Sequence, residues 1–203
     1  MKNTRAKILN AALQLFNDKG MVNVSLRQIA QELKISQGNL NYHFKLKEDI
    51  VEALYVQLVG EMNLQMTSMD AAGTVLEALY ESSLKTMEKM FDYKFILIDF
   101  IHLMNANPKI KSHYADLMKI RNEQFQVIFH SLIKSNILRR PEFEHEYERL
   151  YQRMNIAGDS WINIYATFDE NNTVQYYCNL LFEMIYPYLT EKGKEAYQKI
   201  RKA

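Results

Sequence analysis

The chain has 203 residues, of which 48% are hydrophobic and 24% charged, and its formal net charge at pH 7 is +1. This composition excludes an intrinsically disordered chain and leaves room for one or two domains with buried cores. The charge is unevenly placed, because residues 1–47 contain eight lysines and arginines but only two acidic residues, Asp18 and Glu32. That segment carries a net charge of +6 and the remainder −5, so a local site for a polyanion is expected near the N-terminus.

Neither disulfides nor membrane insertion is supported by the sequence. Cys178 is the only cysteine, which excludes a disulfide within the chain and is compatible with a reducing compartment. The first sixteen residues superficially resemble a signal peptide, yet Asn10 and Gln14 interrupt the apolar stretch and no small-residue cleavage site follows. No apolar run approaches the roughly 20 residues of a membrane-spanning helix. We therefore expect a cytoplasmic protein with no membrane partner.

The first predicted helix runs from about Thr4 to Lys19 and ends at Gly20. Apolar side chains recur along one side of it, at Ile8, Ala11, Ala12, Leu15 and Phe16. This stripe predicts a helix that packs against other elements of a small N-terminal unit.

Two short helices joined by a tight turn are predicted next. Ser25 and Gln28 have the spacing of a capping box, in which each side chain accepts a hydrogen bond from the backbone of the other, so a helix begins here. The apolar face of that helix consists of Leu26, Ile29, Ala30 and Leu33. After a very short connection, Ser36 caps a second helix that runs from Gln37 to Phe44.

The second short helix turns only Leu40 and Phe44 inward. Its other positions are mostly hydrogen-bonding side chains, namely Gln37, Asn39, Asn41, Tyr42 and His43. Gly38 follows the cap by two residues, where a missing side chain lets the backbone approach a partner closely. A short helix with outward donors and acceptors suits the major groove of DNA, where base edges present a readable pattern.

These segments resemble the N-terminal helix-turn-helix of the TetR/AcrR family of transcriptional repressors. The resemblance covers roughly residues 4 to 54 and rests on Ser-Leu-Arg-Gln-Ile-Ala from Ser25, Ile-Ser-Gln-Gly-Asn-Leu from Ile35, Tyr-His-Phe-Lys from Tyr42 and Lys-Glu-Asp-Ile from Lys47. Two positions depart from the family pattern. Lys34 stands where the family usually has glycine, which predicts an unusual backbone conformation, and Asn41 replaces an aromatic residue that commonly touches a DNA phosphate in the family.

The resemblance implies double-stranded operator DNA as a partner. Our candidates for base-edge contacts are Gln37, Asn39 and Asn41, since amide side chains suit adenine. We expect Gly38 to allow close approach of the backbone. Our candidates for phosphate contacts are Ser25, Arg27, Tyr42, His43 and Lys47, the last at a helix N-terminus that favours an anion.

The rest of the chain is predicted to be helical, with no strand patterns. A fourth helix begins near Lys47 and is long enough to connect two domains, which we place at residues 1–47 and 48–203. Further helices are predicted at about 72–91, 93–105, 108–136, 142–168, 173–188 and 190–202. We therefore expect an all-α protein with an N-terminal three-helix helix-turn-helix domain and a larger helical domain for effector binding and dimerisation, as the resemblance implies.

The resemblance also implies a homodimer through the helices near 142–168 and 173–188. One face of each is apolar, and these faces include Tyr147, Tyr151, Gly158 and Trp161 on the first and Tyr177, Cys178 and Ile185 on the second. An ordinary intramolecular core is the alternative for each residue. A small hydrophobic or aromatic effector is implied inside the larger domain, with Phe95, His102, Phe129, Trp161 and Tyr165 as candidate contacts, although core packing is again the simpler alternative.

A catalytic function has little support, because the common nucleophile, phosphate-loop and metalloprotease motifs are absent. Asp99 and His102 could supply half of a metal site, but no second ligand pair has matching spacing. We expect no enzyme, no catalytic residue, no metal site and no cofactor. The favoured hypothesis is a one-component DNA-binding regulator, a repressor released by a small molecule. The alternative is a TetR-like helical carrier of a lipid or hydrophobic metabolite that does not bind DNA, but such a carrier need not keep Tyr42, His43, Lys47 or the basic N-terminal segment.

Overall fold

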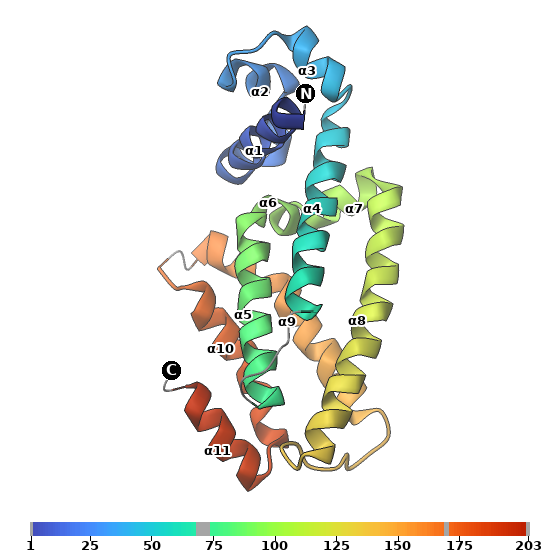
Figure 1. Ribbon diagram of the computed structural model, residues 1–203, viewed down its shortest axis with the longest axis vertical. Coiled ribbons are helices and arrows are strands. Elements are labelled where there is room, and N and C mark those ends of the chain that lie inside the picture. The colour runs from blue at the N-terminus through green and yellow to red at the C-terminus, as the bar shows by residue number, and fades with distance from the viewer. Residues whose placement is uncertain (1, 68–73, 169–170, 202–203) are drawn as a thin grey trace.

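The computed structural model describes residues 2–67, 74–168 and 171–201, which contain helices and no strand. Figure 1 shows a small head at one end of an elongated molecule and a larger helical body below it. The head consists of α1 (Lys2–Lys19), α2 (Leu26–Glu32) and α3 (Gln37–His43). Its core contains Ile8, Ala12, Phe16, Ile29, Leu40 and Phe44, each at most 3% exposed. The predicted all-α fold with an N-terminal three-helix unit is confirmed.

Both predicted helix caps in the head are present. The Ser25 hydroxyl accepts the backbone N–H of Gln28 at 3.3 Å, and the Gln28 side chain accepts the backbone N–H of Ser25 at 2.8 Å. The Ser36 hydroxyl accepts the backbone N–H of Asn39 at 3.1 Å. These bonds satisfy backbone donors at the helix starts and fix how α3 leaves the turn.

The turn between α2 and α3 places Lys34 in the left-handed region, with φ of 53°. The Ile35 N–H donates to the Ala30 carbonyl and the Lys34 N–H to the Gln31 carbonyl, both at 3.0 Å. These two bonds form the Schellman ending of a helix, which glycine fits best. The unusual conformation predicted for Lys34 is therefore confirmed.

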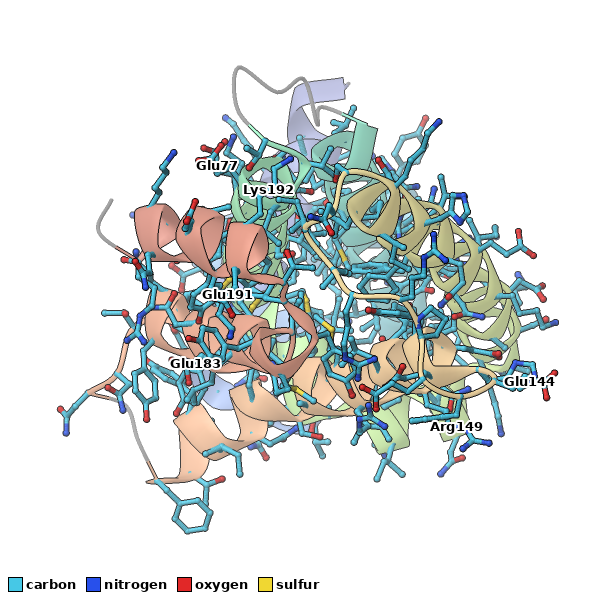
Figure 2. All side chains as sticks on the ribbon, turned by 90° about the horizontal axis from the view of Figure 1, so that it is seen from below. Glu77, Glu144, Arg149, Glu183, Glu191 and Lys192 are labelled. Atoms are coloured by element: carbon cyan, nitrogen blue, oxygen red, sulfur yellow. The ribbon has the colours of Figure 1, made fainter. Side chains whose placement is uncertain are left out.

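The body begins with α4 (Lys47–Thr67), which runs from the head into the interior of the bundle (Figure 1). It continues with α5 (Val75–Asp92), α6 (Lys94–Ile98), α7 (Phe100–Ala106), α8 (Pro108–Lys134), α9 (Glu146–Phe168), α10 (Val174–Glu183) and α11 (Glu191–Ile200). Short 3-10 helices span Met21–Asn23 and Tyr186–Tyr188. In Figure 2, which looks from the end away from the head, Glu144 and Arg149 project on one side and Glu183 on the other.

Three of the predicted helices differ from the structure. The expected helix 93–105 is broken at Asp99, whose carboxylate accepts the backbone N–H of Met21 in the head at 3.3 Å. The expected helix 142–168 begins only at Glu146, after His145 with φ of 61°. The expected helix 173–188 ends its α-helical part at Glu183, before Pro187, which lacks a backbone donor. Residues 72, 73 and 202 of the expected ranges lie outside the described residues.

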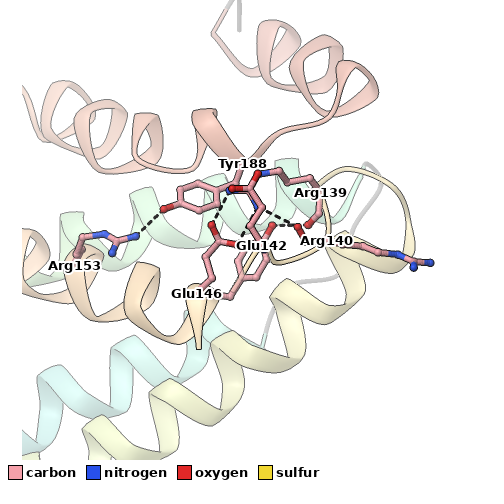
Figure 3. A network of polar contacts seen from close by, with 7 residues as sticks. Arg139, Arg140, Glu142, Glu146, Arg153 and Tyr188 are labelled. Atoms are coloured by element: carbon pink, nitrogen blue, oxygen red, sulfur yellow. Dashed lines mark hydrogen bonds and ion pairs between the residues drawn. The ribbon is translucent and has the colours of Figure 1, made fainter. Parts of the chain in front are cut away.

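A polar network closes the end of the body that faces away from the head (Figure 3). Glu146, which is 3% exposed, accepts two hydrogen bonds from the Arg139 guanidinium at 2.7 and 2.9 Å. It also accepts the backbone N–H of Glu142 at 2.8 Å. These bonds, with that from Arg139 as the largest cause, lower the pKa of Glu146. The network therefore holds the connection between α8 and α9 in one conformation.

We expect Arg139→Met to lower the free energy of unfolding at pH 7 by about 2 kcal/mol, the range for hydrogen bonds to a charged group, because it leaves the buried Glu146 carboxylate without its cation. The pKa of Glu146 is lower in the folded chain, so the contribution of the pair is present above the unfolded pKa of about 4.3 and is lost as the pH falls through the folded pKa. Urea unfolding of wild type and variant at pH 7 and below pH 4 measures this difference.

The matched control is Lys119→Met, since Lys119 forms an exposed pair with Asp116 at 3.1 Å and exposed pairs contribute little. A difference between wild type and Arg139→Met that persists unchanged at low pH would show that the charge pair is not its origin.

Candidate nucleic-acid interface and interior cavity

The outer face of α3 is polar and exposed. Gln37, Gly38, Asn39 and Asn41 are all exposed, whereas Leu40 is fully buried. Phe44, which follows α3, is 3% exposed and lies under the Arg5 guanidinium, 4.8 Å from the ring centroid. Two buried anchors thus hold a short helix whose amide side chains point away from the head, the geometry needed for a helix that enters a major groove.

The candidate phosphate contacts lie on the same head. Tyr42 is 71% exposed, and its ring packs edge-on against His43 with centroids 5.2 Å apart. Ser25 and Arg27 are exposed at the start of α2. Lys47 is half-buried and its ammonium donates to the Met21 carbonyl at 3.0 Å, which leaves further N–H donors on the same group.

The head is joined to the body by hydrogen bonds as well as by α4. The Asn17 side chain donates to the Asp92 carbonyl at 2.8 Å and accepts the backbone N–H of Phe95 at 3.1 Å. Asp99 accepts the N–H of Met21, whose carbonyl accepts Lys47. The break between α6 and α7 is therefore tied directly to the head, and this contact was not foreseen from the sequence.

The body contains a cavity of about 200 Å³ between α4, α5, α8, α9 and α10, with α6 and α7 at one end. Its wall is mainly apolar and contains the methionines Met62, Met87, Met90, Met118 and Met154. Aromatic side chains on the wall include Tyr55, Phe100, Tyr114, Phe125 and Tyr151. Thioethers and rings of this kind suit an apolar or aromatic ligand.

Among the described residues that line this cavity, Arg121 is the one strongly basic side chain and Asp159 the one carboxylic acid. The Tyr114 hydroxyl donates to the Asp159 carboxylate at 2.8 Å. Burial raises the pKa of Asp159, and the hydrogen bond from Tyr114 opposes that rise. Burial likewise raises the pKa of Tyr151 to about 12, with Arg121 acting against the increase. Tyr151 thus lies close enough to Arg121 and Asp159 to feel both charges.

None of the five predicted effector contacts lines this cavity. Phe95 is buried against Phe16 of the head, Phe129 packs on Phe125 and Tyr147, and Trp161 packs on Phe91 and Tyr177. Tyr165 is half-buried against Phe91, and His102 is exposed. These aromatic residues pack in the core of the protein. Helical periodicity alone cannot distinguish a residue of the core from a residue of a ligand pocket. Arg121, which lines the cavity and was not among the predicted contacts, is a cation on the otherwise largely apolar face of α8 that carries Tyr114, Leu117 and Phe125.

The apolar faces predicted for dimerisation are also largely internal. Tyr147, Tyr151, Trp161, Tyr177, Cys178 and Ile185 are buried within the chain, and Gly158 lines the cavity near Leu181. The other side of the same two helices exposes a different apolar set, namely Ile156, Ile164, Phe168, Tyr176 and Leu180, each at least 42% exposed. No helix in the described ranges has the length and apolar character needed to cross a membrane.

Two family models match the chain. One, described as bacterial transcriptional repressor (TetR), matches residues 57–197, and another, described as bacterial regulatory proteins of the tetR family, matches residues 8–54. The first covers more than half of the chain and the second covers the head.

Curated relatives carry names of the same kind. HTH-type transcriptional regulator UidR of Escherichia coli (strain K12) is 24% identical over 107 residues, which cover 53% of this chain and 55% of that protein. The match thus spans about half the length of UidR. HTH-type transcriptional regulator SAB2452 of Staphylococcus aureus (strain bovine RF122 / ET3-1) is 24% identical over 180 residues, 83% of this chain and 95% of that protein.

Solved structures share the fold. A TetR-family transcriptional regulator from Marinobacter aquaeolei VT8 has a TM-score of 0.87 at 23% identity and covers 98% of both chains. A transcriptional regulator from Saccharomonospora viridis, solved in complex with choline, has a TM-score of 0.76 at 23% identity and covers 94% of this chain and 100% of that one. At these identities the likeness concerns the fold.

Proposed function

The chain belongs to the TetR family of bacterial transcriptional repressors, and on this basis we propose that it is a one-component repressor that binds operator DNA and is released by a small molecule. The observation that carries the proposal is the exposed polar face of α3, anchored by the buried Leu40 and Phe44. Within its two turns α3 exposes Gln37, Asn39, Asn41 and Tyr42, and hydrogen-bonding groups in this position suit a helix that reads a groove. We assign residues 1–47 to DNA binding and residues 48–203 to effector binding and dimerisation.

The proposed contacts sort by chemistry. Gln37, Asn39 and Asn41 read base edges, and Gly38 lets the backbone of α3 approach the duplex. Ser25, Arg27, Tyr42, His43 and Lys47 contact phosphates and set the position of the head on the duplex. Because Lys47 also bonds to Met21, which bonds to Asp99, this phosphate contact is connected to the break between α6 and α7.

Two copies of the chain are proposed to pair through α9 and α10, since the exposed Ile156, Ile164, Phe168, Tyr176 and Leu180 lie there. Apolar side chains that are exposed on one chain gain most when a second copy covers them. A two-fold dimer places two α3 helices on two half-sites of the operator. A protein with this function acts in the cytoplasm, and the cavity of the body is the proposed effector site. The neighbour from Saccharomonospora viridis, solved in complex with choline, supports a small-molecule ligand.

The test is a gel-shift series with duplex DNA from upstream of its own gene at increasing salt concentration. We expect the logarithm of the binding constant to fall linearly with the logarithm of the salt concentration, by about 0.9 per phosphate contact. Lys47→Ala should weaken binding to all sequences alike and reduce this slope by about 1.

Lys119→Ala is the matched control, because this exposed lysine lies on α8, which belongs to the body. Absent or salt-independent binding of every DNA fragment would overturn the proposal and favour the carrier of a hydrophobic metabolite. An unchanged slope for Lys47→Ala would exclude the proposed docking of the head.

A further inference from the structure

Arg121 is a buried cation in the wall of the cavity. Its side chain is 7% exposed, and its guanidinium donates to the amide oxygens of Gln124, at 2.7 Å, and Asn63. Both acceptors are neutral, and no acidic side chain in the described part of the chain forms an ion pair with Arg121. Two hydrogen bonds leave three of the five guanidinium N–H donors for another partner.

Glu146, the other strongly buried charged residue in the described part of the chain, has a counter-charge. Glu146 is 3% exposed and is neutralised by two hydrogen bonds from Arg139. A buried charge without a counter-charge is costly, and removing one partner of a buried pair is strongly destabilising for that reason. An anionic ligand bound beside Arg121 would therefore supply the counter-charge that this buried guanidinium lacks.

The carboxylic acid on the described cavity wall, Asp159, is not paired with Arg121. Asp159 bonds to Tyr114, and along α8 Tyr114 precedes Arg121 by seven residues, which is about 10 Å of helix. Asp159 thus has a hydrogen-bond donor of its own, and it forms no ion pair with Arg121 in the described part of the chain. A guanidinium stays protonated, so Arg121 keeps its positive charge.

The space beside this charge is apolar and roomy enough for an organic molecule. A volume of about 200 Å³ is the space of between six and seven water molecules at the roughly 30 Å³ that each takes in the liquid. The wall between the level of Arg121 and that of Tyr114 includes Leu117 and Met118 of α8. The Thr86 hydroxyl on α5 lines the same cavity and is buried without a hydrogen-bond partner in the described residues.

We infer that the effector is a small organic carboxylate, whose carboxylate accepts hydrogen bonds from the Arg121 guanidinium and whose apolar body lies along the methionine-rich wall toward Tyr114. Two parallel N–H···O bonds are the usual geometry of this pair and give it directional specificity. This inference names the effector class for the proposed repressor and so rests on the proposed function. A carboxylate of this kind is an anion, whereas choline, present in the structure of the neighbour from Saccharomonospora viridis, is a cation.

The test uses three probes with the same eight-carbon chain and different head groups, namely octanoate, 1-octanol and octylamine. Calorimetric titration into the full-length protein at neutral pH measures each dissociation constant. We expect octanoate to bind about 10- to 100-fold more tightly than 1-octanol or octylamine, the range for hydrogen bonds to a charged group. This comparison within the wild-type protein does not depend on whether a variant folds.

Variants then locate the head group. Arg121→Met should remove the preference for octanoate over 1-octanol, and Arg121→Lys should retain part of it, because the charge remains but the two-point geometry is lost. Lys119→Met is the matched control, since it removes a cation from the exposed side of the same helix, and it should leave all three constants unchanged.

The contrary results are equally specific. Tighter binding of octylamine that Asp159→Asn abolishes would overturn the inference and assign the cavity to a cationic ligand. Equal binding of all three probes, or no saturable binding of any, would also overturn it. DNA binding measured on the same preparations separates this result from the proposed function: intact DNA binding with no octanoate preference refutes only the inference, whereas octanoate binding without any DNA binding refutes only the repressor.

Discussion

We expect the Gly38→Ala variant to keep its fold and to lose DNA affinity by about 5- to 150-fold, the equivalent of the 1–3 kcal/mol that an added methyl costs in a tight contact. In the free protein a Cβ at this position would meet only the Ser36 hydroxyl, at 4.0 Å, and Gly38 does not have a positive φ. Alanine is also the better helix former. Nothing in the described part of the free chain therefore requires glycine here, so any requirement comes from a bound partner.

The measurement is urea unfolding and operator titration on the same samples. The free energy of unfolding should be unchanged or higher by up to about 1 kcal/mol, while the gel-shift midpoint moves to higher protein concentration. Gly60→Ala is a matched control, because a Cβ there meets nothing within 4 Å and the residue lies on α4 in the body. Undiminished DNA affinity of Gly38→Ala would contradict close approach of the α3 backbone to the duplex.

The opposite behaviour is expected for Gly193→Ala, which should lower the free energy of unfolding by about 3 kcal/mol. A Cβ at this buried position would collide with the Ile137 carbonyl oxygen and lie 3.1 Å from the Leu189 side chain. That carbonyl accepts the backbone N–H of Thr190 at 3.0 Å, so the backbone cannot yield without breaking the bond that docks α11. Relief of the clash therefore requires displacement of the helix itself.

Chemical denaturation monitored by circular dichroism checks this value, again with Gly60→Ala as the control. Gly60→Ala is expected to be more stable than wild type by about 0.5–1 kcal/mol, because alanine has the higher helix propensity. A Gly193→Ala variant as stable as wild type would mean that α11 does not pack on the α8–α9 connection as described.

The head was predictable because its signals are local. The capping box at Ser25, the cap at Ser36 and the strained position at Lys34 depend on residues within a few positions of each other, and all three are present in the structure. The inward Leu40 and the outward amides of α3 follow from helical periodicity alone. Which of those outward groups touch DNA stays a prediction.

The body was less predictable because its features depend on distant segments. At the helix break, the Asp99 carboxylate accepts a hydrogen bond from the backbone N–H of Met21, which is 78 positions away in the sequence. Trp161 and Tyr177 pack against each other in the core of the chain, and periodicity cannot tell which neighbour an apolar face will meet. The more informative signal was a polar exception, Arg121, because a cation on an apolar face needs a specific partner.

The central claim is that the exposed face of α3 reads the base sequence of an operator. The most direct measurement is selection of binding sites from a random duplex library by the wild-type protein and by Asn39→Ala. We predict a two-fold symmetric site with half-sites about 34–36 Å apart, or a multiple of that distance, in which Asn39→Ala changes the preferred base at one position of each half-site. Enrichment of no sequence, or of the same sequence by both proteins, would contradict the claim.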